Sequence, residues 1–201
     1  TSDRGLCGGF NTNLIRQAEK FIATPERTAV LGTIGRKGYD FYKRRSVEII
    51  ENVPATSAAP IELAREIVAK AVARFVNEEV DEIYLLFSRF RSAISQVPTV
   101  ARLLPIEAPA ASEEPREYLF EPDRDAVIES ILPRYVEVRV FQAVLESIAS
   151  EHGARMTAME SASKNASEMI ERLTLEMNRA RQATITKELM EIVGGAEALK
   201  G

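Results

Sequence analysis

The longest regular pattern in the chain lies in its last third, between Arg134 and Val193. This stretch contains no proline and a single glycine, Gly153. Apolar or small residues, with one histidine among them, recur along it about every 3.5 residues, the period of a coiled-coil seam. These positions are Phe141, Leu145, Ile148, His152, Met156, Met159, Ala162, Ala166, Met169, Leu173, Met177 and Ala180. The pattern predicts one helix about 90 Å long, whose apolar stripe needs another helix or another protein to cover it.

The earlier part of the chain alternates between patterns typical of helices and of short strands. Apolar faces at helical spacing predict helices over residues 13–23 and 35–45 and a third that begins at Pro60, which fits the first helical position. Strands are predicted over residues 28–34, 47–53, 83–87 and 93–104. The continuous apolar run of residues 83–87 is typical of a strand buried on both faces in a parallel sheet, whereas Pro98 places the last strand at a sheet edge.

This alternation predicts an α/β fold with an open, Rossmann-like and mostly parallel sheet, flanking helices and a long C-terminal coiled-coil helix. The predicted domains are an α/β domain over residues 1–120 and a helical region over residues 121–201. A short helix should run from Asp123 to about residue 132, Pro133 should kink the chain, and the long helix should follow. Asp123 and Asp125 are interpreted as capping and first-turn acids rather than metal ligands, since no histidine or cysteine is near.

Composition removes several classes of function. The net charge is −4, so a broad nucleic-acid-binding surface is not expected. Cys7 is the single cysteine, which excludes an intramolecular disulfide and fits a reducing compartment. No apolar run approaches the roughly 18 residues of a membrane-spanning helix.

The glycine-rich segment of residues 1–10, TSDRGLCGGF, allows two interpretations. It precedes a predicted helix start at Asn11, so it could cradle a phosphate. However, neither the Walker pattern nor GxGxxG matches it, and a tight strand-to-helix turn explains the glycines more simply. Cys7 is interpreted as a packed or partner-facing small residue rather than a nucleophile, because no histidine lies near it in sequence. Titration calorimetry with ATP and ADP would distinguish a nucleotide-binding enzyme from a non-catalytic protein.

Two features of the long helix also leave alternatives open. His152, the only histidine, could be a ligand or a pH switch, but a partly solvated histidine on a helix surface is the simpler interpretation. Arg179 and Arg181 lie in a stretch without acidic residues, from Met177 to Lys187. They belong either to a solvated face or to a surface that meets an acidic loop of a partner.

Two stretches at opposite ends of the chain carry a family resemblance. Residues 2–11, SDRGLCGGFN, and residues 180–189, ARQATITKEL, with EIVGGA at 191–196, resemble the two signature stretches of the gamma subunit of F-type ATP synthase. Residues 132–137, LPRYVE, and residues 150–156, SEHGARM, are similar to that family too. The likeness runs from Thr1 to the C-terminus in the order of the family.

The resemblance implies a central rotor-stalk subunit without catalytic residues, cofactor or metal. Such a subunit couples proton-driven rotation of the c ring to conformational change in the catalytic alpha/beta hexamer. Its implied partners are the alpha, beta and epsilon subunits and the c-subunit ring. The implied location is the cytoplasmic face of a bacterial inner membrane, where the subunit is peripheral and attached only through partners. The alternative function is a static coiled-coil adaptor or scaffold with an α/β domain.

By analogy with the family, two groups of residues are expected to contact partners. Those expected to meet the alpha and beta subunits are Arg155, Arg181, Gln182, Thr186 and Glu188. Those expected to meet the c ring and epsilon are Tyr118, Phe120 and Glu121, with Phe120 standing where the family usually has tyrosine.

The resemblance also implies that the family's N-terminal helix and the start of its first strand are absent from this sequence. The apolar stripe then lacks its coiled-coil partner, so the fragment is expected to self-associate or to fray. Seven acidic and six basic residues between Glu151 and Glu191 leave no large single-sign field along the helix. That balance suits a shaft that must turn inside a sleeve.

Overall fold

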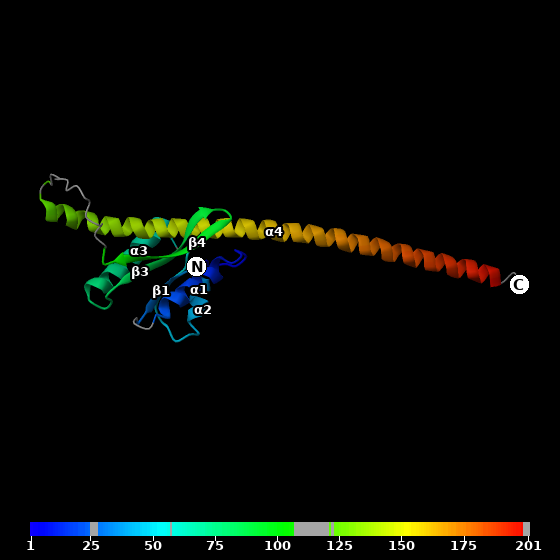
Figure 1. Ribbon diagram of the computed structural model, residues 1–201, viewed down its shortest axis with the longest axis horizontal. Coiled ribbons are helices and arrows are strands. Elements are labelled where there is room, and N and C mark those ends of the chain that lie inside the picture. The colour runs from blue at the N-terminus through cyan, green and yellow to red at the C-terminus, as the bar shows by residue number, and fades with distance from the viewer. Residues whose placement is uncertain (25–27, 57, 107–120, 122, 199–201) are drawn as a thin grey trace. The chain divides into compact units, whose positions relative to one another are not determined.

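The computed structural model describes residues 1–24, 28–56, 58–106, 121 and 123–198. Helices and strands follow one another as the sequence predicts. Their order is α1 (Phe10–Ile22), β1 (Val30–Ile34), α2 (Arg36–Tyr42), β2 (Glu48–Val53), α3 (Pro60–Val76), β3 (Ile83–Ser92), β4 (Ser95–Leu104) and α4 (Arg124–Ala198). The strands and the shorter helices lie beside the N-terminal part of α4 (Figure 1).

In the described part of the chain, four strands form two separate two-stranded sheets. β1 and β2 are parallel, with α2 between them in sequence. β3 and β4 instead form an antiparallel hairpin, where the sequence predicted a strand of a parallel sheet. Only Ala93 and Ile94 separate these two strands, and a parallel partner would need a crossover of about a dozen residues or more. The predicted class, with parallel strands, helices and a long C-terminal helix, is otherwise confirmed.

Helix α4 runs without interruption from Arg124 to Ala198, with Pro133 inside it. The predicted short helix ending near residue 132 is therefore not a separate element. Proline has no N–H, so Pro133 cannot donate to the carbonyl of Glu129, four residues earlier. Both residues are exposed, so water can donate to that carbonyl instead. At the start of the helix, Oδ1 of Asp123 accepts a hydrogen bond from the Ala126 N–H at 2.9 Å, as predicted for a capping acid.

The chain divides into two compact units, Thr1–Ala158 and Met159–Gly201. This division falls well beyond the predicted boundary at residue 120, because the first part of α4 packs into the α/β unit. In the second unit, every residue from Met159 to Ala196 is exposed. None of the described helices combines the length and apolar character needed to cross a membrane.

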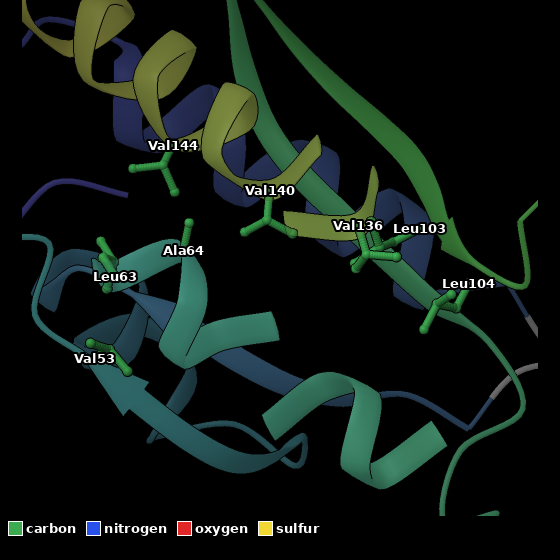
Figure 2. Close-up of a cluster of buried hydrophobic side chains, with 8 residues drawn as sticks. All are labelled: Val53, Leu63, Ala64, Leu103, Leu104, Val136, Val140 and Val144. Atoms are coloured by element: carbon green, nitrogen blue, oxygen red, sulfur yellow. The ribbon is translucent and has the colours of Figure 1, made fainter. Parts of the chain in front are cut away.

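The core of the first unit joins α4 to α3. Leu63 and Ala64 on α3 are 1% and 0% exposed and belong to one cluster with Val136, Val140 and Val144. These valines recur every four residues, so they share one face of α4. Figure 2 shows Val140 and Val144 facing the two α3 residues. Each buried valine or leucine contributes about 1.5–3 kcal/mol, so the cluster holds α4 firmly against the α/β unit.

The fully buried face of α4 differs from the stripe that the period indicated, although Phe141 and Ile148 of that stripe pack half-buried against the same core. Leu145 and Met156 of that stripe are 43% and 56% exposed, and His152 is exposed as well. The buried face is a second one, carried by valines and by Ala143 and Ala154. The exposure of His152 agrees with the simpler interpretation of a solvated histidine on a helix surface.

A buried hydrogen bond between two serines connects α4 to the hairpin. Ser150 Oγ donates to the carbonyl of Ser88 at 2.9 Å, and the two residues are 0% and 2% exposed. Pro98 lies opposite Ser88 in the hairpin and has no N–H to donate. The Ser150 hydroxyl supplies this buried carbonyl with a donor.

Replacing Ser150 with alanine is expected to lower the free energy of unfolding of the first unit by about 1–3 kcal/mol, since a buried carbonyl loses its donor. Urea unfolding would measure the change. Ser130→Ala is the matched control, because the Ser130 hydroxyl also bonds a carbonyl, that of Val127, but at an exposed position of α4. The control should change stability by less than about 0.5 kcal/mol. Equal losses in both variants would contradict the assigned role of Ser150.

Candidate functional site

The amide side chain of Asn11 bonds to two residues of the glycine-rich segment, Ser2 and Cys7. Asn11 Nδ2 donates to Ser2 Oγ at 2.7 Å and to Cys7 Sγ at 3.2 Å. Asn11 Oδ1 accepts a hydrogen bond from the Ser2 N–H at 2.9 Å. Helix α1 begins at Phe10, after Gly9, so the prediction that Asn11 caps this helix is wrong. The Asn11 amide instead closes the turn in front of the helix.

Cys7 is 2% exposed and packs with Phe10, Leu14 and Ala154. Its interpretation as a packed small residue is therefore confirmed. Because Ala154 belongs to α4, this small cluster attaches the glycine-rich turn to the long helix. Across the described residues, no group of three or more histidine, cysteine or acidic side chains converges in a way that could hold a metal ion.

Asp3 connects the same segment to two other parts of the unit. Its Oδ1 accepts hydrogen bonds from the N–H groups of Arg36 at 3.0 Å and Ala55 at 3.2 Å. Its Oδ2 accepts from the N–H and the hydroxyl of Thr56 at 3.0 and 2.9 Å. Burial acts to raise the pKa of Asp3, but the hydrogen bonds from Thr56, Ala55 and Arg36 together outweigh it, so the pKa lies below its ordinary value.

Asp3→Ala is expected to lower the free energy of unfolding by about 1–3 kcal/mol, the range for hydrogen bonds to a charged group. Because the folded pKa is depressed, this contribution is present at neutral pH and is lost as the pH falls below about 4, where aspartate titrates in the unfolded chain. Urea unfolding of both proteins between pH 7 and 3 would measure it. Asp81→Ala, at an exposed aspartate, is the control. A difference between wild type and Asp3→Ala that persists unchanged at pH 3 would contradict the assigned charge.

The tip of the β3–β4 hairpin meets α4 near the end of the first unit. Thr157 Oγ1 donates to the carbonyl of Ala93 at 3.0 Å. A Cβ atom added to Gly153 would lie 3.2 Å from Phe90 Cε2 and 3.3 Å from Ala93 Cα. Gly153, the one glycine within the predicted long helix, thus permits the hairpin to approach α4 closely.

Two exposed apolar side chains lie next to these contacts with α4. Ile94, beside Ala93 in the hairpin turn, is 84% exposed, and Leu6, in the glycine-rich turn, is 76% exposed. A Cβ atom added to Gly8 would lie 3.7 Å from Ala158 Cβ, so that turn also reaches the end of the unit. The sequence did not single out Leu6 or Ile94, because an isolated apolar residue in a turn belongs to no period.

Arg155, the first of the residues expected to contact a partner, is engaged within the chain. Its guanidinium lies 2.7 Å from the carboxylate of Glu151, one helical turn earlier, and the two side chains are 28% and 20% exposed. The ion pair leaves only part of the guanidinium accessible. Arg155 lies in the first unit, whereas the other four residues of its group lie in the second.

Arg181, Gln182, Thr186 and Glu188 all lie on α4 and are all exposed. Seven residues separate Arg181 from Glu188 and four separate Gln182 from Thr186, so each pair shares one face of the helix. The two faces lie about 100° apart, since successive residues of an α-helix turn by that angle. The helix therefore presents these polar groups around a broad sector rather than along one seam.

The residues expected to face the c ring and epsilon lie mainly outside the described part of the chain. Tyr118 and Phe120 are among the residues that the structure does not describe. Glu121 is described, and it is exposed just before α4 begins. Its exposure is compatible with a contact.

Comparison with known proteins gives one consistent result. The protein family described as ATP synthase matches residues 1–199. The ATP synthase gamma chain of Moorella thermoacetica is 50% identical over 201 residues, which cover all of this chain and 71% of that protein. The ATP synthase gamma chain of Geobacter metallireducens is 51% identical over 212 aligned residues, covering all of this chain and 72% of the relative.

Solved structures agree with these relatives. A chain in the central stalk and c ring of Tetrahymena thermophila mitochondrial ATP synthase is 27% identical, with a TM-score of 0.65 over 81% of this chain and 73% of that one. A chain of the Euglena gracilis mitochondrial enzyme shares the fold, with a TM-score of 0.72 and 23% identity over 99% of this chain and 70% of that one. With half of its residues identical to curated gamma chains along its whole length, the chain belongs to the ATP synthase gamma chain family.

Proposed function

We propose that this chain is a central rotor-stalk subunit, which couples rotation of a c ring to conformational change in a catalytic alpha/beta hexamer. The observation that carries this proposal is the identity of about half its residues to gamma chains over its entire length. The likeness to a central-stalk chain at 27% identity supports it. In this role the chain performs no chemistry of its own and transmits torque.

The second unit has the properties that a turning shaft requires. Its helical part, residues 159–198, is about 60 Å long at 1.5 Å per residue. It carries six acidic and five basic residues between Met159 and Ala196. Two exposed i,i+4 ion pairs, Lys164–Glu168 and Lys187–Glu191, lie within this helix. In each pair the lysine partly balances the charge of the glutamate. A near-neutral surface avoids a strong electrostatic attachment at any one angle.

We assign Arg181, Gln182, Thr186 and Glu188 to contacts with alpha and beta subunits, together with the accessible part of Arg155. Their exposure around a broad sector of α4 suits a surrounding sleeve better than a single dimer seam. Tyr118, Phe120 and Glu121 are assigned to the c ring and epsilon. On this proposal the chain is peripheral at the cytoplasmic face of a bacterial inner membrane and is attached only through its partners.

Reconstitution with purified alpha and beta subunits of a bacterial relative would test this function. ATP hydrolysis is expected to rise several-fold when the chain is added to alpha and beta. Arg181→Ala should reduce that rise by a factor of about five or more if its guanidinium is buried at the contact. Arg172→Ala is the matched control, because Arg172 is another exposed arginine of the same helix unit. No stimulation by the unmodified chain would refute the proposal.

The alternative of a static adaptor makes a different prediction in the same complex. A disulfide engineered between α4 and a beta subunit should stop turnover reversibly if the chain rotates. An adaptor that stays in one place would tolerate the cross-link, so hydrolysis would continue. Full activity in the oxidised complex would therefore favour the adaptor.

A further inference from the structure

Four residues of α4 that meet the β3–β4 hairpin lie on one face of the helix. This hairpin face consists of Glu146, Ser150, Gly153 and Thr157, separated in turn by four, three and four positions. Residues at such intervals line one side of an α-helix. None of the four carries a large apolar side chain, so the hairpin face differs in chemistry from the valines that pack on α3.

The contacts along the hairpin face depend on direction and on close fit. The hydroxyls of Ser150 and Thr157 donate to hairpin carbonyls at 2.9 and 3.0 Å. Nε of Arg89 on β3 lies 3.9 Å from Oε2 of Glu146, a buried oxygen that accepts no hydrogen bond from the described residues. At Gly153 the missing side chain leaves room for the hairpin tip. Hydrogen bonds constrain angle as well as distance, whereas apolar contact is non-directional.

The tip of the hairpin is braced by one of its own side chains. Gln96 Nε2 donates to the carbonyls of Ser92 and Ala93 at 3.2 and 2.6 Å. These two bonds tie the chain before the turn to the first residues of β4. The Ala93 carbonyl also accepts from Thr157, so the braced turn and α4 share one acceptor.

The hairpin face and the valine face of α4, Val136, Val140 and Val144, point in different directions. At 100° per residue they lie about 100° apart around the helix axis. A helix held on one apolar face can roll on it, and directional contacts on a second face prevent that roll. The last residue of the hairpin face, Thr157, lies next to the end of the first unit at Ala158. Residues 159–196 are all exposed.

We propose that the β3–β4 hairpin is a polar clasp that prevents α4 from rolling about its own axis where the helix leaves the first unit. Glu146, Ser150, Gly153 and Thr157 are positioning residues, because they act through the orientation of α4. With the clasp open, the helix rolls on its valine face, and torque applied to the first unit turns the helix in place before it reaches the shaft. This inference rests on the proposed function, in which α4 transmits torque.

Hydrogen exchange of the 201-residue chain tests the clasp independently of any partner. Thr157→Val removes the hydroxyl and keeps the shape of the side chain. The amides of residues 90–96 and 150–158 should then exchange about fivefold faster, the factor expected for one lost hydrogen bond. Thr157→Ser retains the hydroxyl and should retain the slow exchange. Thr174→Val, at an exposed threonine of the second unit, is the matched control and should leave these amides unchanged.

Gly153→Ala separates the clasp from the stability of the helix. Alanine favours the helix more than glycine does, but its Cβ would lie 3.2 Å from Phe90 Cε2 and 3.3 Å from Ala93 Cα. The helix around residue 153 is therefore favoured locally, while the hairpin tip is pushed away. Exchange should become faster in residues 90–96 of the tip without becoming faster in residues 145–152 of α4.

The role in torque is tested in the assembled enzyme with the double variant Gly153→Ala, Thr157→Val. The angular fluctuations of a particle attached to the c ring of stalled enzyme report the torsional stiffness of the rotor, and they should widen in this variant but not in Thr174→Val. Unchanged fluctuations in normally assembled enzyme would overturn the role in torque. Unchanged exchange in Thr157→Val, or equal acceleration in Thr157→Ser, would overturn the clasp itself. Failure of the unmodified chain to stimulate hydrolysis would refute the proposed function, and the exchange results would still decide the clasp.

Discussion

Val140→Asp is expected to lower the free energy of unfolding of the first unit by about 4 kcal/mol or more. Val140 is 1% exposed and lies in the cluster that joins α4 to Leu63 and Ala64 of α3. The substitution removes about 1.5–3 kcal/mol of apolar burial. It also places a carboxylate where no partner is present in the cluster, which costs several kcal/mol more or forces the group to become neutral.

Val138→Asp provides a control of the same chemistry on the same helix. Val138 lies two residues away and is 60% exposed, so its replacement should change stability by less than about 0.5 kcal/mol. Urea unfolding should be followed by tyrosine fluorescence or by hydrogen exchange within residues 1–106, because the helix of the second unit dominates circular dichroism. Similar losses in the two variants would show that α4 is not held through this face.

The same pair of variants also bears on the proposed function. On the proposed function, force applied to the first unit reaches the shaft through the valine face of α4. Val140→Asp should therefore reduce coupled turnover in the reconstituted complex, while Val138→Asp should leave it near the level of the unmodified chain.

The sequence predicted where the helices and strands lie more reliably than which strands pair with one another. Apolar periodicity located all seven shorter elements, and Pro60 at the start of α3 was found where a proline fits a helix. The direction of β3 was missed because an apolar run does not encode which neighbour it pairs with. The hairpin turn at Ala93-Ile94 also lacks the Asn-Gly or Gly residues that usually mark such turns.

The long helix shows a second limit of pattern analysis. Between residues 136 and 156, α4 carries two apolar faces, and the period of 3.5 residues selected the less buried one, of which Leu145, His152 and Met156 are exposed. The packed face uses valines four residues apart, and its partners Leu63 and Ala64 lie more than seventy residues earlier in the chain. Only the tertiary structure shows which of two such faces meets the core.

For the candidate site, the sequence identified residues but not their surroundings. Arg181, Gln182, Thr186 and Glu188 are exposed as a contact surface requires, while the ion pair of Arg155 with Glu151 was not foreseen. Asp3 was named only within a motif, because its hydrogen-bond donors come from Arg36 and from the segment after β2. No local spacing connects positions that far apart.

Gly35→Ala is expected to lower the free energy of unfolding by about 3–5 kcal/mol, through backbone strain and a steric clash together. Gly35 precedes α2 with φ +86° and ψ 148°, a region that essentially only glycine adopts. An added Cβ would lie 2.0 Å from the Thr1 carbonyl oxygen and 2.7 Å from its carbon. These are backbone atoms, so no side-chain rotation can relieve the contact.

Gly32→Ala is the control, since a Cβ atom added there would meet nothing within 4 Å. It should change stability by less than about 1 kcal/mol, because any strain is offset by the reduced freedom of the unfolded chain. Thermal and urea unfolding of both variants would measure the difference. Comparable losses at the two glycines would mean that neither the φ angle nor the Thr1 contact is responsible.

A double variant that combines Gly35→Ala with Asp3→Ala would show which part of the chain moves to relieve the clash at Gly35. If the backbone of Thr1 and Ser2 moves away from the methyl group that Gly35→Ala introduces, the adjacent Asp3 must leave its donors after β2 and at the start of α2 as well. The loss in Gly35→Ala then already includes the loss in Asp3→Ala, and the double variant should cost less than the sum, by about 1 kcal/mol or more. Additive losses would instead show that α2 moves while the N-terminal segment stays in place. Non-additivity would thus identify Gly35 as the residue that permits the segment before α1 to dock against both α2 and the end of β2.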